Sequence, residues 1–317
     1  MILTVTLNPS VDHALFVDNL SLNDTNRVKH TERDAGGKGV NVARVAAEMG
    51  AEVLATGFLG GGPGAYVRHV LELQGVKNDF VEVSEETRIN FSVEDGSNNP
   101  PTTFNEPGPT ISAQEFEDLR EHCRRMSARA SWICLGGSLP PGVPVDAFKT
   151  SIADCRSSSC SVVLDADGES LKHGLQGGPT FIKPNSKEAG RLIGRNLSTV
   201  DDCVEAARTF LRQLEVVDAG REPIVIISRG ADGAVLATGS HVLVGHTPIV
   251  EVNSTIGSGD SLIGGMLWAI ESGKSLDEAF CWGLAAGAAT AMTNGSEIAR
   301  RPIVEKLFPQ ARVETIA

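Results

Sequence analysis

Residues 255–265, TIGSGDSLIGG, bring together glycines, hydroxyl groups and one carboxylate at the predicted start of a helix. Backbone N–H groups at a helix start have no intrahelical acceptor, so those of Gly257, Ser258 and Gly259 can bind an anion. Asp260 follows them, where it could accept a proton from an attacking hydroxyl group. Taken alone, the stretch favours an ordinary acid that stabilises a helix N-terminus over a catalytic base.

A second stretch, residues 34–44, reads DAGGKGVNVAR and leads directly into a helical pattern. We expect Gly36, Gly37 and Gly39 to permit a tight turn with positive φ and to let backbone N–H groups approach a ligand closely. Lys38 adds a positive charge. The stretch therefore predicts an anion site, with a glycine-rich turn that binds nothing as the alternative.

Two common nucleotide motifs are absent or weak in the sequence. No G-x-x-x-x-G-K-[ST] loop occurs. The run GFLGGGPG at residues 57–64 only loosely approaches a dinucleotide fingerprint, and no acid follows in the expected register.

Charge and cysteine usage narrow the class of protein. The 317 residues carry a net charge of −12, which argues against a nucleic-acid partner or an anionic membrane surface and for a soluble protein. Six cysteines are scattered without a C-x-x-C pair, which favours a reducing cytoplasm. The first residues, MILTVTLNPS, do not resemble a signal peptide, and no apolar run reaches membrane-spanning length.

Apolar runs of strand length alternate with longer helical patterns, which predicts repeated βα units. The predicted strands are residues 2–7, 53–59, 131–137, 161–167, 180–185 and 223–228. The predicted helices include residues 39–50, 112–126, 200–217 and 261–273. Because these strands are apolar throughout, we expect an α/β core with a mostly parallel sheet covered by helices on both faces.

Two polar, alternating stretches interrupt this pattern, at about residues 8–34 and 87–107. The second contains DGSNN between two alternating runs, as in a hairpin. We expect both stretches to form a small β-sheet lid over the carboxyl edge of the core, where open α/β sheets bind ligands. The whole chain, residues 1–317, is then a single domain.

Five motifs in one order resemble the ribokinase/PfkB family of carbohydrate kinases. They are GGKGVNVAR, GSLPPGVP, KPNSKEA, SRGADGAVLA and NSTIGSGDSLIGG, and the resemblance extends from residue 1 to about residue 310. TLNPSVD, NRV, TRIN and NEPGP look like the branch of the family that phosphorylates hexose phosphates. The resemblance implies a ribokinase-like three-layer αβα fold.

The resemblance assigns roles at the phosphoryl-transfer end of the site. It implies that Asp260 is the general base and that Gly257, Ser258 and Gly259 form an anion hole. Asn185 and Glu188 would organise Mg²⁺, through water, although KPNSKEA alone also fits an ordinary capped helix. The residues expected to contact ATP are Lys183, Asn185, Ser228, Gly230, Ala231, Gly233, Gly257, Gly259 and Gly287.

On the acceptor side the resemblance implies a sugar-phosphate pocket built partly from the lid. The residues expected there are Asp12, Arg27, Gly37, Lys38, Asn41, Arg88, Asn90, Gly137 and Ser138. Arg27 and Arg88 are the lid cations expected on the substrate's phosphate, since a guanidinium binds phosphate in a bidentate manner.

The expected reaction is the ATP- and Mg²⁺-dependent conversion of fructose 1-phosphate to fructose 1,6-bisphosphate, with a homodimer formed through the lid. Tagatose 6-phosphate and fructose 6-phosphate remain open as alternative substrates. Outside the kinase class, an NAD-dependent oxidoreductase and a non-catalytic sugar-phosphate-binding regulator are the remaining alternatives.

Overall fold

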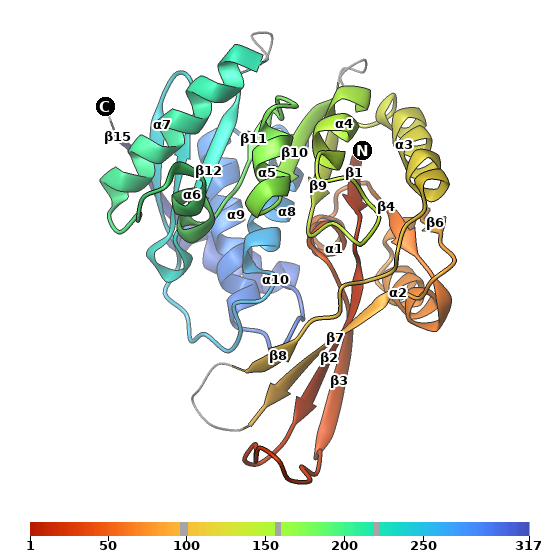
Figure 1. Cartoon of the computed structure of the whole chain (residues 1–317). Helices are drawn as coiled ribbons and strands as arrows, with labels where there is room; N and C mark the ends of the chain where they lie inside the picture. The colour runs from red at the N-terminus through yellow and green to blue at the C-terminus, as the bar shows by residue number, and fades with distance from the viewer. Residues whose placement is uncertain (96–100, 156–159, 218–221, 317) are drawn as a thin grey trace.

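The structure, a computed structural model, describes residues 1–95, 101–155, 160–217 and 222–316 (Figure 1). A large sheet lies at its centre. Its strands are β1 (Ile2–Thr6), β4 (Val53–Leu59), β5 (Lys77–Asn78), β6 (Val81–Glu82), β9 (Trp132–Gly136), β10 (Ser161–Asp165), β11 (Phe181–Ile182), β12 (Ile224–Ser228), β13 (Ala234–Ala237), β14 (Val242–His246) and β15 (Arg312–Ile316). Their order is β15-β14-β13-β12-β11-β10-β9-β1-β4-β5, with β6 beside β4.

Two layers of helices cover this sheet. Apolar residues on one face pack against α3 (Ala113–Ser127), α4 (Ala147–Cys155), α5 (Gly168–Leu175), α6 (Ser186–Ile193) and α7 (Val200–Val217). The other face packs against α1 (Lys38–Glu48), α2 (Gly61–Leu73), α8 (Ser258–Glu271) and α9 (Leu276–Ala291), and α10 (Arg301–Leu307) packs on this layer. The three-layer core with a mostly parallel sheet is as the sequence predicted.

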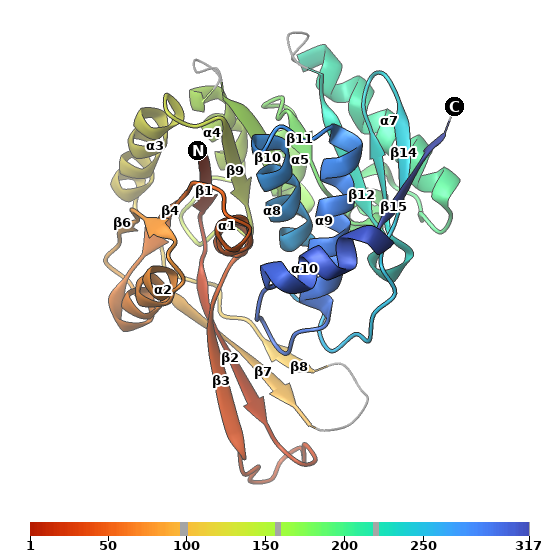
Figure 2. The ribbon, with the colours of Figure 1, turned by 180° about the vertical axis from the view of Figure 1, so that it is seen from behind.

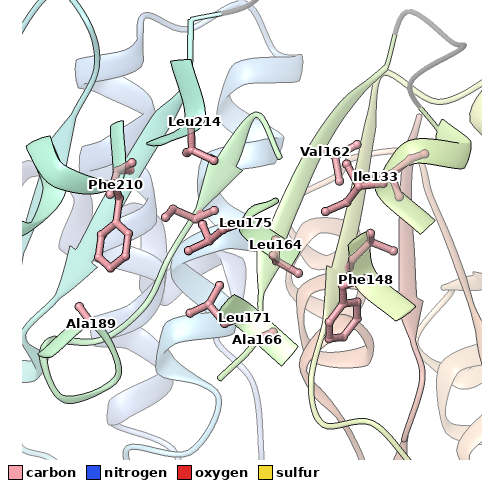
Figure 3. Packing of buried hydrophobic residues seen from close by; sticks show 14 of the residues in the cluster. Ile133, Phe148, Val162, Leu164, Ala166, Leu171, Leu175, Ala189, Phe210 and Leu214 are labelled. Atoms are coloured by element: carbon pink, nitrogen blue, oxygen red, sulfur yellow. The ribbon is translucent and has the colours of Figure 1, made fainter. Parts of the chain in front are cut away.

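Continuous apolar strands supply the core on both faces of the sheet. Ile133 of β9 and Val162 of β10 point toward the layer that contains Phe148 of α4 (Figure 3). The next residues along these strands, Cys134 and Val163, are equally buried on the opposite face. Alternate residues of a strand face opposite sides of the sheet. Strands that are apolar at every position are therefore required only where helices cover both faces.

A separate four-stranded sheet projects from one edge of the core (Figure 2). It consists of β2 (Ser10–Phe16), β3 (His30–Gly36), β7 (Arg88–Glu94) and β8 (Thr102–Phe104), in the order β3-β2-β7-β8. The antiparallel pairing of β7 with β8 forms the hairpin expected around DGSNN. Residues 96–99 of that turn lie outside the described residues.

The antiparallel end of the large sheet was not predicted. β13, β14 and β15 pair antiparallel beyond β12, and β15 comes from the last residues of the chain. The helical patterns did mark elements correctly, since α7 spans the predicted residues 200–217. β15, RVETI, is mostly exposed and mixes charged with apolar residues, so it lacks the continuous apolar run that marked the buried strands.

Candidate active site

The predicted site residues gather at the carboxyl edge of the parallel strands. Gly137 follows β9, Lys183 follows β11, and Ser228 ends β12. In the large sheet β1 lies between β4 and β9. β4 is the next core strand along the chain, whereas β9 comes later and lies on the other side of β1, so the order of the strands changes direction here. Such switch points open a crevice at the carboxyl ends of strands, where α/β proteins bind ligands.

Asp260 lies in the first turn of α8, beside the backbone N–H groups that precede the first helical hydrogen bond; of these, the N–H of Ser258 makes one long contact, 3.4 Å, with the carbonyl of Thr255. α8 begins at Ser258, after Gly257 in the left-handed conformation with φ 74°. The N–H of Ser261 donates to the carbonyl of Gly257 at 2.8 Å, and the N–H groups from Ser258 to Asp260 precede this bond. The side-chain amide of Asn41, on α1, donates to Asp260 Oδ2 at 2.8 Å. A buried carboxylate is therefore held next to the predicted anion hole.

The surroundings of Asp260 suit a general base. Burial raises the pKa of this carboxyl to about 6, and the negative charge of Asp165 acts in the same direction. Lys38, Asn41 and Lys183 oppose the rise. A base works best when its pKa lies near the working pH, since it is then ionised yet basic enough to take a proton.

Asp165 is a central residue that the sequence analysis missed. It is 1% exposed, at the end of β10, and its Oδ1 lies 2.8 Å from Lys38 Nζ while its Oδ2 lies 3.4 Å from Lys183 Nζ. Burial by itself raises the pKa of Asp165, but the two lysines outweigh this and lower it. An acid at the end of an apolar predicted strand was the available signal.

The ion pairs with Asp165 fix Lys183 and Lys38 on two sides of the site. A Cβ atom added to Gly259 would lie 2.9 Å from Lys183 Nζ, so this ammonium group borders the anion hole. Burial acts to lower the pKa of Lys38, but Asp165 and Asp260 raise it overall. Both ammonium groups can therefore meet anions at the carboxyl edge of the sheet.

The glycine-rich stretch 34–44 differs in part from our prediction. Gly37 has φ 112° and precedes α1, as a tight turn requires. Gly36 and Gly39 do not have positive φ. They lie where a side chain would collide, Gly36 with the carboxylate of Asp12 and Gly39 with Thr6. Two of the three glycines therefore permit close packing rather than an unusual backbone conformation.

Asp12 and Asn90 come together on the small sheet. They face each other across β2 and β7, and the amide of Asn90 donates to Asp12 Oδ1 at 2.9 Å. Ser10 Oγ donates to the same oxygen at 2.8 Å. Both Asp12 and Asn90 line a cavity of about 730 Å³ between the small sheet and residues 294–300. This polar wall is suited to sugar hydroxyl groups.

Arg88 borders a second cavity, of about 590 Å³. Its guanidinium donates to the carbonyls of Asn8 at 3.0 Å and Glu106 at 3.3 Å, while Nε is buried without an acceptor in the described chain. Burial lowers the pKa of Arg88, against the effect of Asp12 and Glu106. Ser138 lines the same cavity. The structure thus positions one lid cation near the other predicted acceptor residues.

Arg27 is not brought to this group. It lies exposed in the loop between β2 and β3, beyond the last pair of these strands, Phe16 with His30. Asp12 lies four residues closer to the core along the same strand pair.

Asn185 and Glu188 form the ends of a capping box at the start of α6. Asn185 Oδ1 accepts from the N–H groups of Lys187 at 3.0 Å and Glu188 at 2.9 Å, and Glu188 Oε2 accepts from the N–H of Asn185 at 2.8 Å. The contacts of the KPNSKEA stretch are therefore those of an ordinary capped helix, which is the alternative to a magnesium site. Glu188 also lines a cavity of about 510 Å³ with Lys38, Gly137 and Ser138, which places this residue at the site.

In the described part of the chain, no three His, Cys, Asp or Glu side chains converge on a possible metal position. Glu188 at the cavity, with the amide oxygen of Asn185 three residues before it, still fits Mg²⁺, because this ion keeps most of its water shell and needs few protein ligands. Such a site is compatible with Asn185 and Glu188 acting through water.

The remaining nucleotide candidates lie around the ends of β12 and β13. A parallel bridge joins Ser228 to Asn185. Gly230, Ala231 and Gly233 form the turn after β12, where Gly230 has open space beside it. Gly287 of α9 packs against α8, and a Cβ there would lie 3.0 Å from the carbonyl oxygen of Ser258. Helix packing therefore accounts for this last glycine.

Known proteins settle the class to which this arrangement belongs. The model of the pfkB family of carbohydrate kinases matches residues 5–302. The chain belongs to this family. It is 33% identical over 313 residues to the 1-phosphofructokinase of Bacillus subtilis, and 34% identical over 317 residues to that of Borreliella burgdorferi, covering 99% of each relative and at least 99% of this chain.

A solved structure agrees with this assignment. Phosphofructokinase-2 from Escherichia coli, in complex with substrates and products, superposes with a TM-score of 0.90 at 29% identity over 98% of both chains. The predicted ribokinase-like fold, with a smaller sheet beside the core, is confirmed. The chain is thus a carbohydrate kinase, which decides against the oxidoreductase and the non-catalytic regulator. Kinases of this family use ATP with Mg²⁺.

The raised pKa of Asp260 predicts how this kinase responds to pH. Because a base must be ionised, we expect kcat/KM for the acceptor to fall as pH drops through about 6, where the carboxyl becomes protonated. A pH profile of kcat/KM, corrected for the titration of the substrate's phosphate near the same pH, measures this. A profile that stays flat down to pH about 4, the ordinary aspartate pKa, would contradict the prediction.

Proposed function

We propose that this kinase transfers the γ-phosphoryl group of ATP to a hexose phosphate, and that the acceptor is fructose 1-phosphate, giving fructose 1,6-bisphosphate. The observation that carries the proposal is the buried Asp260 beside the N–H groups of Gly257, Ser258 and Gly259. The names of the two 1-phosphofructokinase relatives support the acceptor. Tagatose 6-phosphate and fructose 6-phosphate are the alternatives.

In this proposal the protein positions the reactants and stabilises charge. Asp260 takes the proton of the acceptor hydroxyl as its oxygen attacks the γ-phosphorus, and ADP leaves on the opposite side. The N–H groups at residues 257–259 and the ammonium group of Lys183 stabilise the transferring phosphoryl group. Asn185 and Glu188 would hold Mg²⁺ through water, and the bound ion would neutralise charge on the nucleotide phosphates.

The acceptor lies between the small sheet and α1. Asp12, Asn90 and Asn41 bind sugar hydroxyl groups, together with the backbone of Gly37. Lys38 and Arg88 hold the existing phosphate, supported by the unpaired Nε of Arg88. Gly137 and Ser138 border the sugar. Arg27 joins them only if the loop that carries it moves toward Asp12.

The nucleotide occupies the other side of Asp260. We assign its contacts to the carboxyl ends of β11 and β12 and the following turn. The residues are Lys183, Asn185, Ser228, Gly230, Ala231, Gly233, Gly257, Gly259 and, at the helix crossing, Gly287.

We also propose that the chain is a single kinase domain in which residues 8–34 and 87–107 form a lid. One face of this small sheet presents Leu15, Phe91, Val93 and Phe104, and Phe104 is 58% exposed. A second copy of the chain that pairs lid to lid would cover this apolar face and the strand edges. Sedimentation analysis of the purified protein checks whether it is a dimer.

A cytoplasmic location completes the proposal. All six cysteines are thiols, five of them buried. In the described residues, no helix is both long and apolar enough to cross a membrane.

The test of function is Mg²⁺-dependent ADP release with four acceptors: fructose 1-phosphate, fructose 6-phosphate, tagatose 6-phosphate and fructose. We expect the highest kcat/KM with fructose 1-phosphate. A preference for another sugar phosphate would replace the substrate but keep the class. A preference for free fructose would remove the proposed phosphate site.

Arg88 provides a sharper test of that phosphate site. Replacing it by glutamine removes a charged donor, and hydrogen bonds to charged groups contribute about 1.5–3 kcal/mol. We expect Arg88→Gln to raise KM for the sugar phosphate about ten- to hundredfold, with KM for ATP nearly unchanged. Arg191→Gln, which alters an exposed arginine paired with Asp167, is the matched control. An equal rise in both KM values would count against the assignment.

A further inference from the structure

Arg44 is a buried arginine that the proposed reaction does not use. It lies on α1, three residues after Asn41, and its side chain is only 2% exposed. A buried guanidinium group is costly unless its donors are satisfied, so its partners indicate its role. These partners come from three other parts of the chain.

The first partners belong to the lid and to the end of α2. The Nη2 of Arg44 donates to Asp34 Oδ1 at 2.6 Å, and Nη1 donates to the carbonyl of Ala35 at 2.9 Å. Both residues are on β3, and Asp34 faces Asp12 in the pairing of β3 with β2. The Nε donates to Gln74, directly after α2, at 2.8 Å. Arg44 thus fixes the strand next to the proposed sugar residue.

The remaining partner belongs to the segment that supports the anion hole. Nη1 of Arg44 also donates to the carbonyl of Ser296, at 3.4 Å. One residue earlier, the carbonyl of Gly295 accepts from Ser254 Oγ at 2.8 Å. Ser254 Oγ in turn accepts from the N–H of Ile256 at 3.2 Å, immediately before Gly257. Three hydrogen bonds, linked through the backbone at residues 295–296 and 256–257, therefore connect the lid to the anion hole.

The cavity of about 730 Å³ lies between these two ends. Asp12 and Arg44 line it from one side, and Ile256, Gly295 and Ser296 line it from the other. Lid and loop also approach each other directly, since a Cβ on Gly295 would lie 3.7 Å from Glu32 Oε2. A ligand that fills the cavity contacts both elements, and Arg44 holds them at a fixed separation.

We propose that Arg44 is a positioning residue that couples the lid to the anion hole, so that a bound sugar phosphate tightens the binding of ATP. This inference rests on the proposed function, because it assumes that the sugar binds at Asp12 and the γ-phosphate at residues 257–259. Coupling of this kind is reciprocal, so ATP tightens the binding of the sugar phosphate by the same factor.

The test compares the Kd of a non-hydrolysable ATP analogue, with Mg²⁺, in the presence and absence of saturating fructose 1-phosphate. In the native chain we expect the sugar phosphate to tighten the analogue about tenfold, a typical coupling between two sites. In Arg44→Gln the ratio of the two Kd values falls toward one. Arg120→Gln, which breaks an arginine pair with Asp154 on α4, is the matched control and retains the native ratio.

A second variant guards against a local loss of structure, since Arg44→Gln leaves the half-buried Asp34 without its cation. Ser254→Ala removes the contact with Gly295 at the other end of the set and leaves the lid intact. We expect it to lower the ratio as well, and the double variant to lower it no further than either single variant. If Arg44→Gln fails to fold, Ser254→Ala decides the question.

Four outcomes would overturn the inference: a native ratio of one, a native ratio retained in folded Arg44→Gln, a native ratio retained in Ser254→Ala, or additive losses in the double variant. Failure of the proposed function has a different signature. It would appear as absence of sugar-phosphate-dependent ADP release in the native chain.

Discussion

Replacing Asp260 by asparagine is expected to lower kcat by about 10²–10⁴-fold, the contribution of a positioned general base. The amide keeps the size of the side chain, and it can still form a hydrogen bond with Asn41, which lies 2.8 Å from the carboxylate. It cannot accept the proton of the attacking hydroxyl. Single-turnover kinetics with radiolabelled ATP measure the loss, and direct titration measures ATP affinity, which should change little.

Asp277→Asn is the matched control for this variant. Asp277 also lies in the first turn of a helix, α9, but it is exposed and remote from the cavities of the site. If both variants lost activity equally, a general effect of helix-start acids would explain the result. Near-native turnover of Asp260→Asn would refute the assignment of the base.

Asp165→Asn is expected to have the second largest effect, about 10²-fold in kcat. The carboxylate holds Lys38 at 2.8 Å and Lys183 at 3.4 Å, and its loss releases both ammonium groups. Misplacement of a positioning group by about 1 Å can cost a factor of this size. Breaking a buried pair also destabilises the fold, so thermal unfolding must be measured in parallel.

The pH profile separates this effect from simple structural damage. The negative charge of Asp165 raises the pKa of Asp260, so we expect its removal to lower that pKa and to move the acid limb of kcat/KM below pH 6. The substrate's phosphate titrates near the same pH, but it is identical in both enzymes and cannot cause a difference.

Asp154→Asn provides the control for Asp165→Asn, because Asp154 also contacts two cations, Arg120 and Arg124, on the outer layer of helices. It should leave the acid limb in place. An unmoved acid limb in Asp165→Asn, with a higher requirement for Mg²⁺, would instead assign Asp165 to the metal.

The sequence predicted the fold well because its strongest signals are local. Continuous apolar strands and amphipathic helices such as α7 report directly on burial, and the start of α8 was visible as glycines before an acid. The contacts that make the site are not local. Asp165 contacts Lys38, and Arg44 contacts Ser296, each far away along the chain, which no pattern around either residue reveals.

Glycines show in another way that the local sequence does not reveal contacts between distant parts of the chain. Gly36, Gly37 and Gly39 look alike in the sequence, yet only Gly37 has positive φ. The other two are small because Asp12 and Thr6 lie against them, and those neighbours are known only once the sheet is built. Their function in packing could not be separated from a function in turning.

The hydrogen bond between Asn41 and Asp260 joins residues 219 positions apart. Closing so long a loop is entropically unfavourable until the intervening strands and helices have docked, so this contact belongs to the late stages of folding. Recovery of enzymatic turnover during refolding therefore reports completion of the entire tertiary structure, whereas circular dichroism registers the helices before the reactive groups have met.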